Sequence, residues 1–116
     1  MDVYAISFDL KPDVKDVVFA DHVAAYLGAL KQDGRIENWR LLRRKLGFGP
    51  AGTGEWQILI ETRGLAQLDE AFNHIASRGG AIEAMHYEVN RHAINLTFTL
   101  MRDFPDAARV RGEEKF

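Results

Sequence analysis

The sequence predicts a single α+β domain in which two halves meet at a central hairpin. Two extended runs, residues 36–45 and 55–62, flank a stretch of eight residues (47–54) that contains four glycines and one proline. Such a stretch is typical of a hairpin loop. A helical pattern of apolar residues precedes this pair of runs, another follows it, and an extended run lies at each outer end. These observations predict the order strand–helix–strand–strand–helix–strand.

The first strand is predicted over residues 3–10, where alternation creates one fully apolar face. The members of this face are Tyr4, Ile6, Phe8 and Leu10. Pro12 cannot continue a ladder of hydrogen bonds, and Asp13 is expected to cap the following helix. That helix is predicted over residues 14–32, where apolar residues recur at helical spacing, and Gly34 is expected to end it.

The two hairpin strands differ in their patterns. The first has charged residues on both faces, which predicts a position at the edge of the sheet, where long side chains reach water. One of its faces carries Ile36, Asn38, Arg40, Leu42 and Arg44, and the other carries Glu37, Trp39, Leu41, Arg43 and Lys45. The second strand sets the apolar residues Trp56, Ile58 and Ile60 against Gln57, Leu59 and Glu61.

The second half of the chain begins with an amphipathic helix predicted over residues 65–78, which Gly79 and Gly80 end. Residues 81–91 fit a short further helix. Residues 93–102 form the clearest strand, because apolar and polar side chains alternate along it. The apolar set is Ile94, Leu96, Phe98 and Leu100.

Right-handed crossovers place the helices on one side of a four-stranded antiparallel sheet of order 4-1-3-2, which is the ferredoxin-like βαββαβ fold. The apolar strand faces are expected to pack against the helices. The opposite face is left uncovered and is predicted to carry Val3, Ala5, Ser7, Trp39, Leu41, Arg43, Gln57, Leu59, Thr97, Thr99 and Met101. So many apolar groups indicate an interface, and a second copy of the sheet is expected to cover them. Two such sheets would form a homodimeric barrel with a semi-polar interior.

Two local runs carry a resemblance to a known superfamily. They are the Trp-Arg-Leu…Arg-Arg-Lys-Leu-Gly segment of residues 39–47 and the Ala-Gln-Leu-Asp-Glu-Ala-Phe segment of residues 66–72. With the hairpin-centred plan, they make residues 2–106 resemble the dimeric α+β barrel superfamily, and within it a group of small proteins from bacteria, many of them marine. The wider superfamily includes stress-responsive barrel proteins, antibiotic-biosynthesis and haem-degrading monooxygenases, and polyketide cyclases. The resemblance implies a dimer and a cavity but no particular reaction.

Composition narrows the classes of function. The domain is expected to span residues 1–106, and the charged tail of residues 107–116 is expected to be mobile. A formal net charge of -2 offers no basic field, so no nucleic-acid partner is expected. The absence of cysteine excludes disulfides and thiolate chemistry. Neither a signal peptide nor a membrane span of ~20 apolar residues is indicated, so a cytoplasmic protein is expected.

The segment Gly47-Phe-Gly49-Pro-Ala-Gly52 matches the G-x-G-x-x-G pattern of dinucleotide sites letter for letter. A dinucleotide site requires a helix after the glycines, so that the phosphates meet the helix N-terminus. Here a strand is predicted to follow, and a proline interrupts the motif. The pattern therefore favours a flexible hairpin loop over a phosphate site.

A basic cluster formed by Arg40, Arg43, Arg44 and Lys45 lies on the first hairpin strand. Charges on an edge strand oppose the pairing of sheets, which is sufficient reason for the cluster. The alternative is that Arg43, placed with Trp39 on the uncovered face, holds an anionic ligand through its forked donors. A nucleic-acid contact remains a third, weaker interpretation.

The four histidines, His22, His74, His86 and His92, show no spacing typical of metal ligands, and neither a metal nor another cofactor is expected. His22 precedes Tyr26 by one helical turn, and His86 is adjacent to Tyr87. Either histidine could therefore act as the catalytic acid–base group at the mouth of a barrel. The alternative is that both histidines are structural.

Three hypotheses about function remain open. The first is a binding protein that holds a small, largely apolar molecule, with or without a carboxylate, between the two sheets of a homodimer. The predicted ligand-binding residues are Trp39, Arg43, Gln57, Thr97 and Thr99. The second is a cofactor-independent oxygenase or cyclase that acts on such a molecule, with His86 or His22 as base. The third is a dimer without a ligand that acts through protein contacts.

Overall fold

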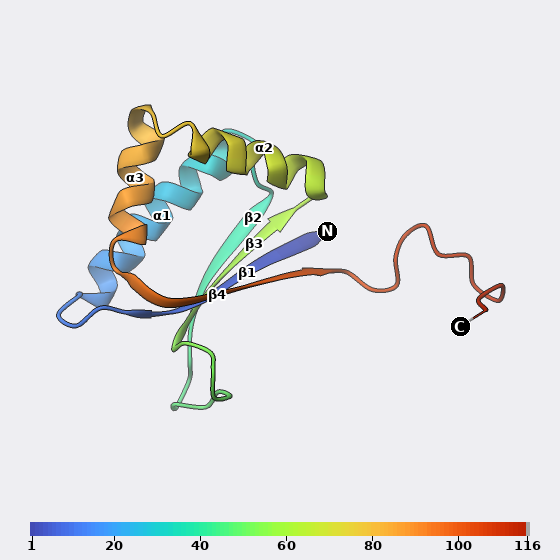
Figure 1. The fold of residues 1–116 in the computed structure, drawn as a ribbon, viewed down its shortest axis with the longest axis horizontal. Coiled ribbons are helices and arrows are strands. Elements are labelled where there is room, and N and C mark those ends of the chain that lie inside the picture. The colour runs from blue at the N-terminus through green and yellow to red at the C-terminus, as the bar shows by residue number, and fades with distance from the viewer. Residues whose placement is uncertain (116) are drawn as a thin grey trace.

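The computed structural model describes residues 1–115 and shows one antiparallel sheet with three helices on one of its faces (Figure 1). The elements are β1 (Asp2–Leu10), α1 (Asp16–Gln32), β2 (Asn38–Arg43), β3 (Trp56–Thr62), α2 (Leu65–Ala76), α3 (Gly80–Asn90) and β4 (Ala93–Arg102). The strands are ordered β2-β3-β1-β4, which confirms the predicted order 4-1-3-2 and the ferredoxin-like fold. Within residues 1–115, no helix combines the length and apolar composition that crossing a membrane requires.

The helices follow the predicted pattern with one correction at the start of α1. This helix begins at Asp16, and Lys15 occupies the capping position without a side-chain hydrogen bond to the helix. Asp13, the expected cap, has a left-handed backbone with φ +70° and belongs to the preceding turn. The short third helix, predicted over residues 81–91, is confirmed as α3.

The register of the hairpin places the side chains of β2 differently from the prediction. Trp39 pairs with Ile60, Leu41 with Ile58, and Arg43 with Trp56. Directly paired residues share a face of the sheet, so Trp39, Leu41 and Arg43 lie on the helix-covered face. The prediction that they lie on the uncovered face was wrong. Asn38, Arg40 and Leu42 take their place there, opposite Glu61, Leu59 and Gln57.

A β-bulge alters the faces of β4. The register with β1 shifts between Ser7 and Asp9, and Asn95 has a left-handed backbone with φ +56°. The bulge turns Ile94 to the same face as its partner Asp9, away from the helices. Leu96, Phe98 and Leu100 keep the predicted helix-side direction, but they remain 37%, 58% and 50% exposed because the helices do not cover this edge strand.

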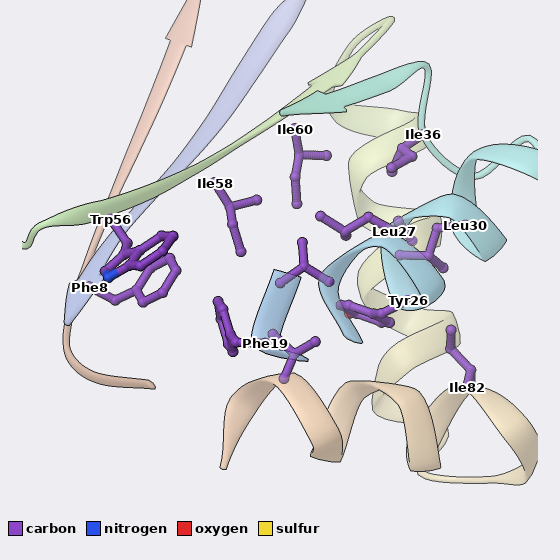
Figure 2. Close-up of a cluster of buried hydrophobic side chains, with 13 residues drawn as sticks. Phe8, Phe19, Tyr26, Leu27, Leu30, Ile36, Trp56, Ile58, Ile60 and Ile82 are labelled. Atoms are coloured by element: carbon purple, nitrogen blue, oxygen red, sulfur yellow. The ribbon is translucent and has the colours of Figure 1, made fainter. Parts of the chain in front are cut away.

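The hydrophobic core lies between α1 and the central strands (Figure 2). Phe19 of α1 meets the ring of Phe8 at a centroid distance of 5.6 Å and the ring of Trp56 at 6.2 Å. The close-up shows Ile58 and Ile60 of β3 pointing toward α1, which presents Leu27 and Leu30 from its buried stripe. Each large side chain buried in this way stabilises the fold by about 1.5–3 kcal/mol.

The glycine-rich loop between β2 and β3 is organised by Arg44. The guanidinium of Arg44 donates hydrogen bonds to the carbonyl oxygens of Pro50 and Thr53 at 2.7 and 2.8 Å. A β-strand follows the loop, so no helix N-terminus faces the glycines. One member of the basic cluster therefore stabilises the hairpin itself.

Candidate functional site

A cavity of about 390 Å³ lies between the sheet and the helices. Its apolar lining comes from every layer of the domain, and includes Ile6 and Phe8 of β1, Ile58 and Ile60 of β3, Leu27 of α1 and Leu68 of α2. Sequence reasoning placed the ligand on the other face of the sheet, between two subunits. This cavity instead lies within one chain, in the layer that also contains the hydrophobic core.

Polar side chains gather on the helical wall of the cavity. Tyr26 of α1 and His86 of α3 both line it, and their ring centroids lie 5.5 Å apart. Asn90, which also lines it, follows His86 by one helical turn and therefore lies on the same side of α3. Arg78, in the turn between α2 and α3, completes the set. These groups can orient a bound molecule, while the remaining wall supplies apolar contact.

Burial sets the protonation states of the two rings. Desolvation lowers the pKa of His86, and the nearby charge of Arg78 lowers it further, while Glu83 opposes this shift. Desolvation, followed by the charge of Glu83, raises the pKa of Tyr26 far above its usual range. At neutral pH the cavity therefore contains a neutral imidazole, able to accept a proton, beside a neutral phenol, able to donate a hydrogen bond.

An ion pair of loose geometry lies behind these rings. A guanidinium nitrogen of Arg78 and the Oε2 atom of Glu83 are 3.7 Å apart, which is too long for a hydrogen bond. The same Oε2 atom is shielded from solvent and has no hydrogen-bond partner among the described residues. The pair thus leaves hydrogen-bonding capacity unused on both sides.

The mouth of the cavity is apolar. Phe72 of α2 and Phe98 of β4 line it and are 44% and 58% exposed. The ring of Tyr4 lies between them, at centroid distances of 5.3 Å from Phe72 and 6.0 Å from Phe98. The edge strand and α2 therefore present an aromatic rim to solvent, through which an apolar molecule can enter.

Two of the predicted ligand-binding residues are occupied by other contacts. Trp39 packs against the hydrophobic core from its place on β2. Arg43 bonds to Glu55 at 3.1 Å and to Asp16 at 3.2 Å, and its guanidinium lies 4.8 Å from the centre of the Trp56 ring. Because two carboxylates already hold Arg43, the structure does not support it as the anion-binding group of a cavity.

The other three predicted ligand-binding residues, Gln57, Thr97 and Thr99, do lie on the uncovered face of the sheet. Ser7 joins Gln57 to Thr97 across the sheet, since it pairs with both. None of the three lines the cavity within the chain. They belong instead to the surface that a second sheet would cover.

The two predicted catalytic histidines lie in different places. His86 lines the cavity, whereas His22 lies in a surface hollow that it shares with His92. The rings of His22 and His92 have centroids 6.4 Å apart, and Glu88 Oε2 is 3.8 Å from His22 Nε2. Within residues 1–115, no set of three or more His, Asp or Glu side chains gathers as a metal site requires.

Sequence reasoning did not identify Tyr26, Arg78 or Asn90 as site residues. Tyr26 belongs to the apolar stripe of α1, so its pattern indicates only a core position. Asn90 lies four residues after His86, a spacing that puts both on one helical face once residues 80–90 are assigned as a helix. Arg78 precedes two glycines and gives no signal beyond that of a helix end.

Comparison with solved structures supports the fold. A dimeric ferredoxin-like protein of unknown function from Bacteroides fragilis is 12% identical and has a TM-score of 0.59, over 88% of this chain and 95% of that chain. An MhuD mutant with two manganese protoporphyrin IX molecules bound per active site has a TM-score of 0.64 at 13% identity, over 94% of this chain and 100% of that chain.

A protein described as an antibiotic biosynthesis monooxygenase has a TM-score of 0.57 at 19% identity, over 90% of this chain and 98% of that chain. Identities this low show a shared fold and nothing more. No curated protein matches the sequence. A model of the family of unknown function DUF6614 matches residues 1–116, the whole length of the chain, and the protein belongs to this family.

Proposed function

We propose that the protein binds a small, largely apolar molecule in the cavity between its sheet and helices, and that it does so as a homodimer. The single observation that carries this proposal is the cavity of about 390 Å³ with its apolar lining and few polar groups. Ligand sites in proteins have this size and this composition.

The location of the polar groups supports binding rather than a simple packing defect. A void left by imperfect packing would be lined by apolar atoms alone. Here Tyr26 and His86 approach one another on one wall, and the aromatic rim of Phe72 and Phe98 lies at the opening. The arrangement suits a molecule with an apolar body and a polar end.

The uncovered face of the sheet supports the homodimer. Its central strands present Ala5 and Ser7, which are 7% and 6% exposed, beside Leu59 of β3. Small side chains make this part of the face flat, so that two sheets can approach closely. The related structure from Bacteroides fragilis is described as dimeric. An isologous pairing of the two sheets would bury this face, including Gln57, Thr97 and Thr99.

A second candidate function is catalysis on the bound molecule without a cofactor. The neutral imidazole of His86 can accept a proton from an acidic C–H or O–H group, and the neutral phenol of Tyr26 can donate a hydrogen bond to the resulting anion. An oxygenase or a cyclase begins with such a step. One neighbour in fold is described as a monooxygenase, which is consistent with this candidate.

Native mass spectrometry of the protein purified from cells tests the proposal. We expect a dimer that carries extra mass, which is lost when the protein is denatured. A dimer without bound mass that also fails to bind any apolar compound would contradict the binding function and favour a dimer that acts through protein contacts. A monomer would contradict the pairing of the sheets. Conversion of the released compound by fresh protein would favour the enzyme, and its return unchanged would favour the binding protein.

A further inference from the structure

We infer that the ligand of this cavity is an apolar carboxylate whose anionic group is bound by Arg78 at the cavity mouth. This inference rests on the proposed binding function and names the class of ligand. It replaces Arg43, which the sequence favoured for an anion and which Asp16 and Glu55 already hold.

Arg78 is the one side chain with a permanent positive charge among those of residues 1–115 that line the cavity. The lining contains no carboxylate, since Glu83 lies behind Arg78 rather than on the wall. The charge of Arg78 also reaches both rings of the polar wall, because it lowers the pKa of Tyr26 and of His86. An anion at Arg78 would therefore lie near two neutral hydrogen-bonding groups.

The backbone of Arg78 is unusual for its residue type. Arg78 follows the C-cap of α2 and has a left-handed conformation with φ +54°. This position normally carries glycine, because a Cβ atom is disfavoured there. Gly79 and Gly80 come directly after it, so the turn has glycine on hand and still presents a charged side chain. A strained residue beside a cavity points to a role for its side chain.

The guanidinium of Arg78 has donors free for a ligand. Its contact with Glu83, at 3.7 Å, is an ion pair and not a hydrogen bond, and its side chain is 64% exposed. Guanidinium has five N–H donors in a fixed fork that matches a carboxylate. An anion at this exposed mouth keeps part of its hydration, while the apolar body of the ligand enters between the aromatic residues of the rim.

Cinnamate and cinnamamide test this inference, because they share one hydrocarbon frame and differ only in charge. Calorimetric titration of the purified protein at neutral pH is expected to show that cinnamate binds about fivefold more tightly, the modest gain that an exposed charge pair allows. Equal binding of the two compounds would overturn the inference and leave the proposed apolar site intact. Binding of neither compound would contradict both.

The variant Arg78→Gly separates anion binding from a structural role. Glycine suits the left-handed backbone, so we expect the melting temperature to stay the same or to rise. The preference for cinnamate should disappear, while the affinity for cinnamamide changes by less than about twofold. Arg91→Gly is the matched control, because Arg91 follows α3 and does not line the cavity. Retention of the preference in Arg78→Gly would overturn the inference.

Discussion

The rings of Tyr26 and His86 lie 5.5 Å apart on the wall of the cavity, although one belongs to α1 and the other to α3. The pair exists because these two helices pack against each other over the sheet. It places the two titratable rings of the site in one partly desolvated environment. The protonation states of these rings, and the space in front of them, are open to direct tests.

His86 is expected to titrate below the ordinary histidine value of about 6.5, because burial disfavours the imidazolium. The groups that face it are Tyr26 from α1, Arg78 from the turn after α2, and Glu83 on α3. NMR titration of the ring protons measures this pKa. We expect Glu83→Gln to lower the pKa further and Arg78→Gln to raise it. A pKa at or above the ordinary value would contradict the site geometry.

The lowered pKa of His86 also predicts a pH dependence of stability. The unfolded chain binds this proton more readily than the folded chain does, so stability is complete above about pH 6.5 and falls as the pH drops through the histidine range. Urea unfolding at several pH values measures the change. His86→Gln should show a smaller loss than the wild type. The loss will not vanish, because the pKa of His92 is lowered as well.

Ala71→Leu is expected to abolish binding of an apolar probe. Ala71 lines the cavity and is 4% exposed, so a larger side chain would fill the space that the ligand needs. Filling a void adds apolar contact, so we expect stability to change by less than about 1.5 kcal/mol. Calorimetry with cinnamamide reports the binding. Ala66→Leu is the control, because Ala66 lies exposed on the same helix, and equal binding by both variants would argue against this cavity as the site.

Asp9 joins three segments of the chain. Its Oδ1 accepts a hydrogen bond from the backbone N–H of Glu55 at 2.9 Å, and its Oδ2 accepts one from Asn95 at 3.1 Å. These bonds, led by that of Glu55, lower the pKa of Asp9. The stabilisation is therefore present above the unfolded value of about 3.9 and is lost as the pH falls through the folded pKa.

Replacing Asp9 by Ala should cost about 1 kcal/mol in urea unfolding at neutral pH. Asp9→Asn keeps an acceptor for Glu55 but removes the charge, so its stability should depend less on acid than that of the wild type. Asp21→Ala is the control, because Asp21 is an exposed residue of α1. A cost in Asp9→Ala no larger than in this control would show that the contacts contribute nothing measurable.

Gly54→Ala is expected to destabilise the fold by about 2 kcal/mol or more, because a Cβ at this position would overlap the backbone carbonyl of Phe8. The substitution would also disturb the buried hydrogen bond from the backbone N–H of Gly54 to Ser7 Oγ, at 2.7 Å. Gly28→Ala provides the contrast, since open space surrounds Gly28 in α1 and alanine favours a helix by about 1 kcal/mol. Thermal melting of both variants should give shifts of opposite sign.

Leu59→Lys should convert the proposed dimer to a monomer with an intact fold. Leu59 is partly buried on the uncovered face, opposite Ala5, so a charged side chain there would meet the partner's sheet. Val17→Lys is the control, since Val17 lies on α1 and is 69% exposed. Light scattering after size exclusion gives the mass of each variant. A dimer that tolerates Leu59→Lys would show that the subunits pair through another surface.

Sequence reasoning succeeded where a local pattern was clear and failed where it was mixed. β3 alternates cleanly, and its residues occupy the predicted faces of the sheet. β2 carries apolar and charged side chains on both faces, so its pattern did not indicate which side meets the helices. The core accepts Trp39 and Leu41, and the hairpin register then leaves Arg40 on the uncovered face. In β4, the bulge at Asn95 moved Ile94 to the other face, a change that strict alternation cannot foresee.

The sequence by itself determined the order of the elements, the order of the strands and the helix-covered face of β1 and β3. Periods of two and of 3.6 residues are written in neighbouring side chains, and turns depend on a few glycines and prolines. Only the tertiary structure decided where the cavity lies and which polar groups meet in it. Tyr26, Arg78 and His86 come from three separate segments, and their distances depend on how the helices pack over the sheet.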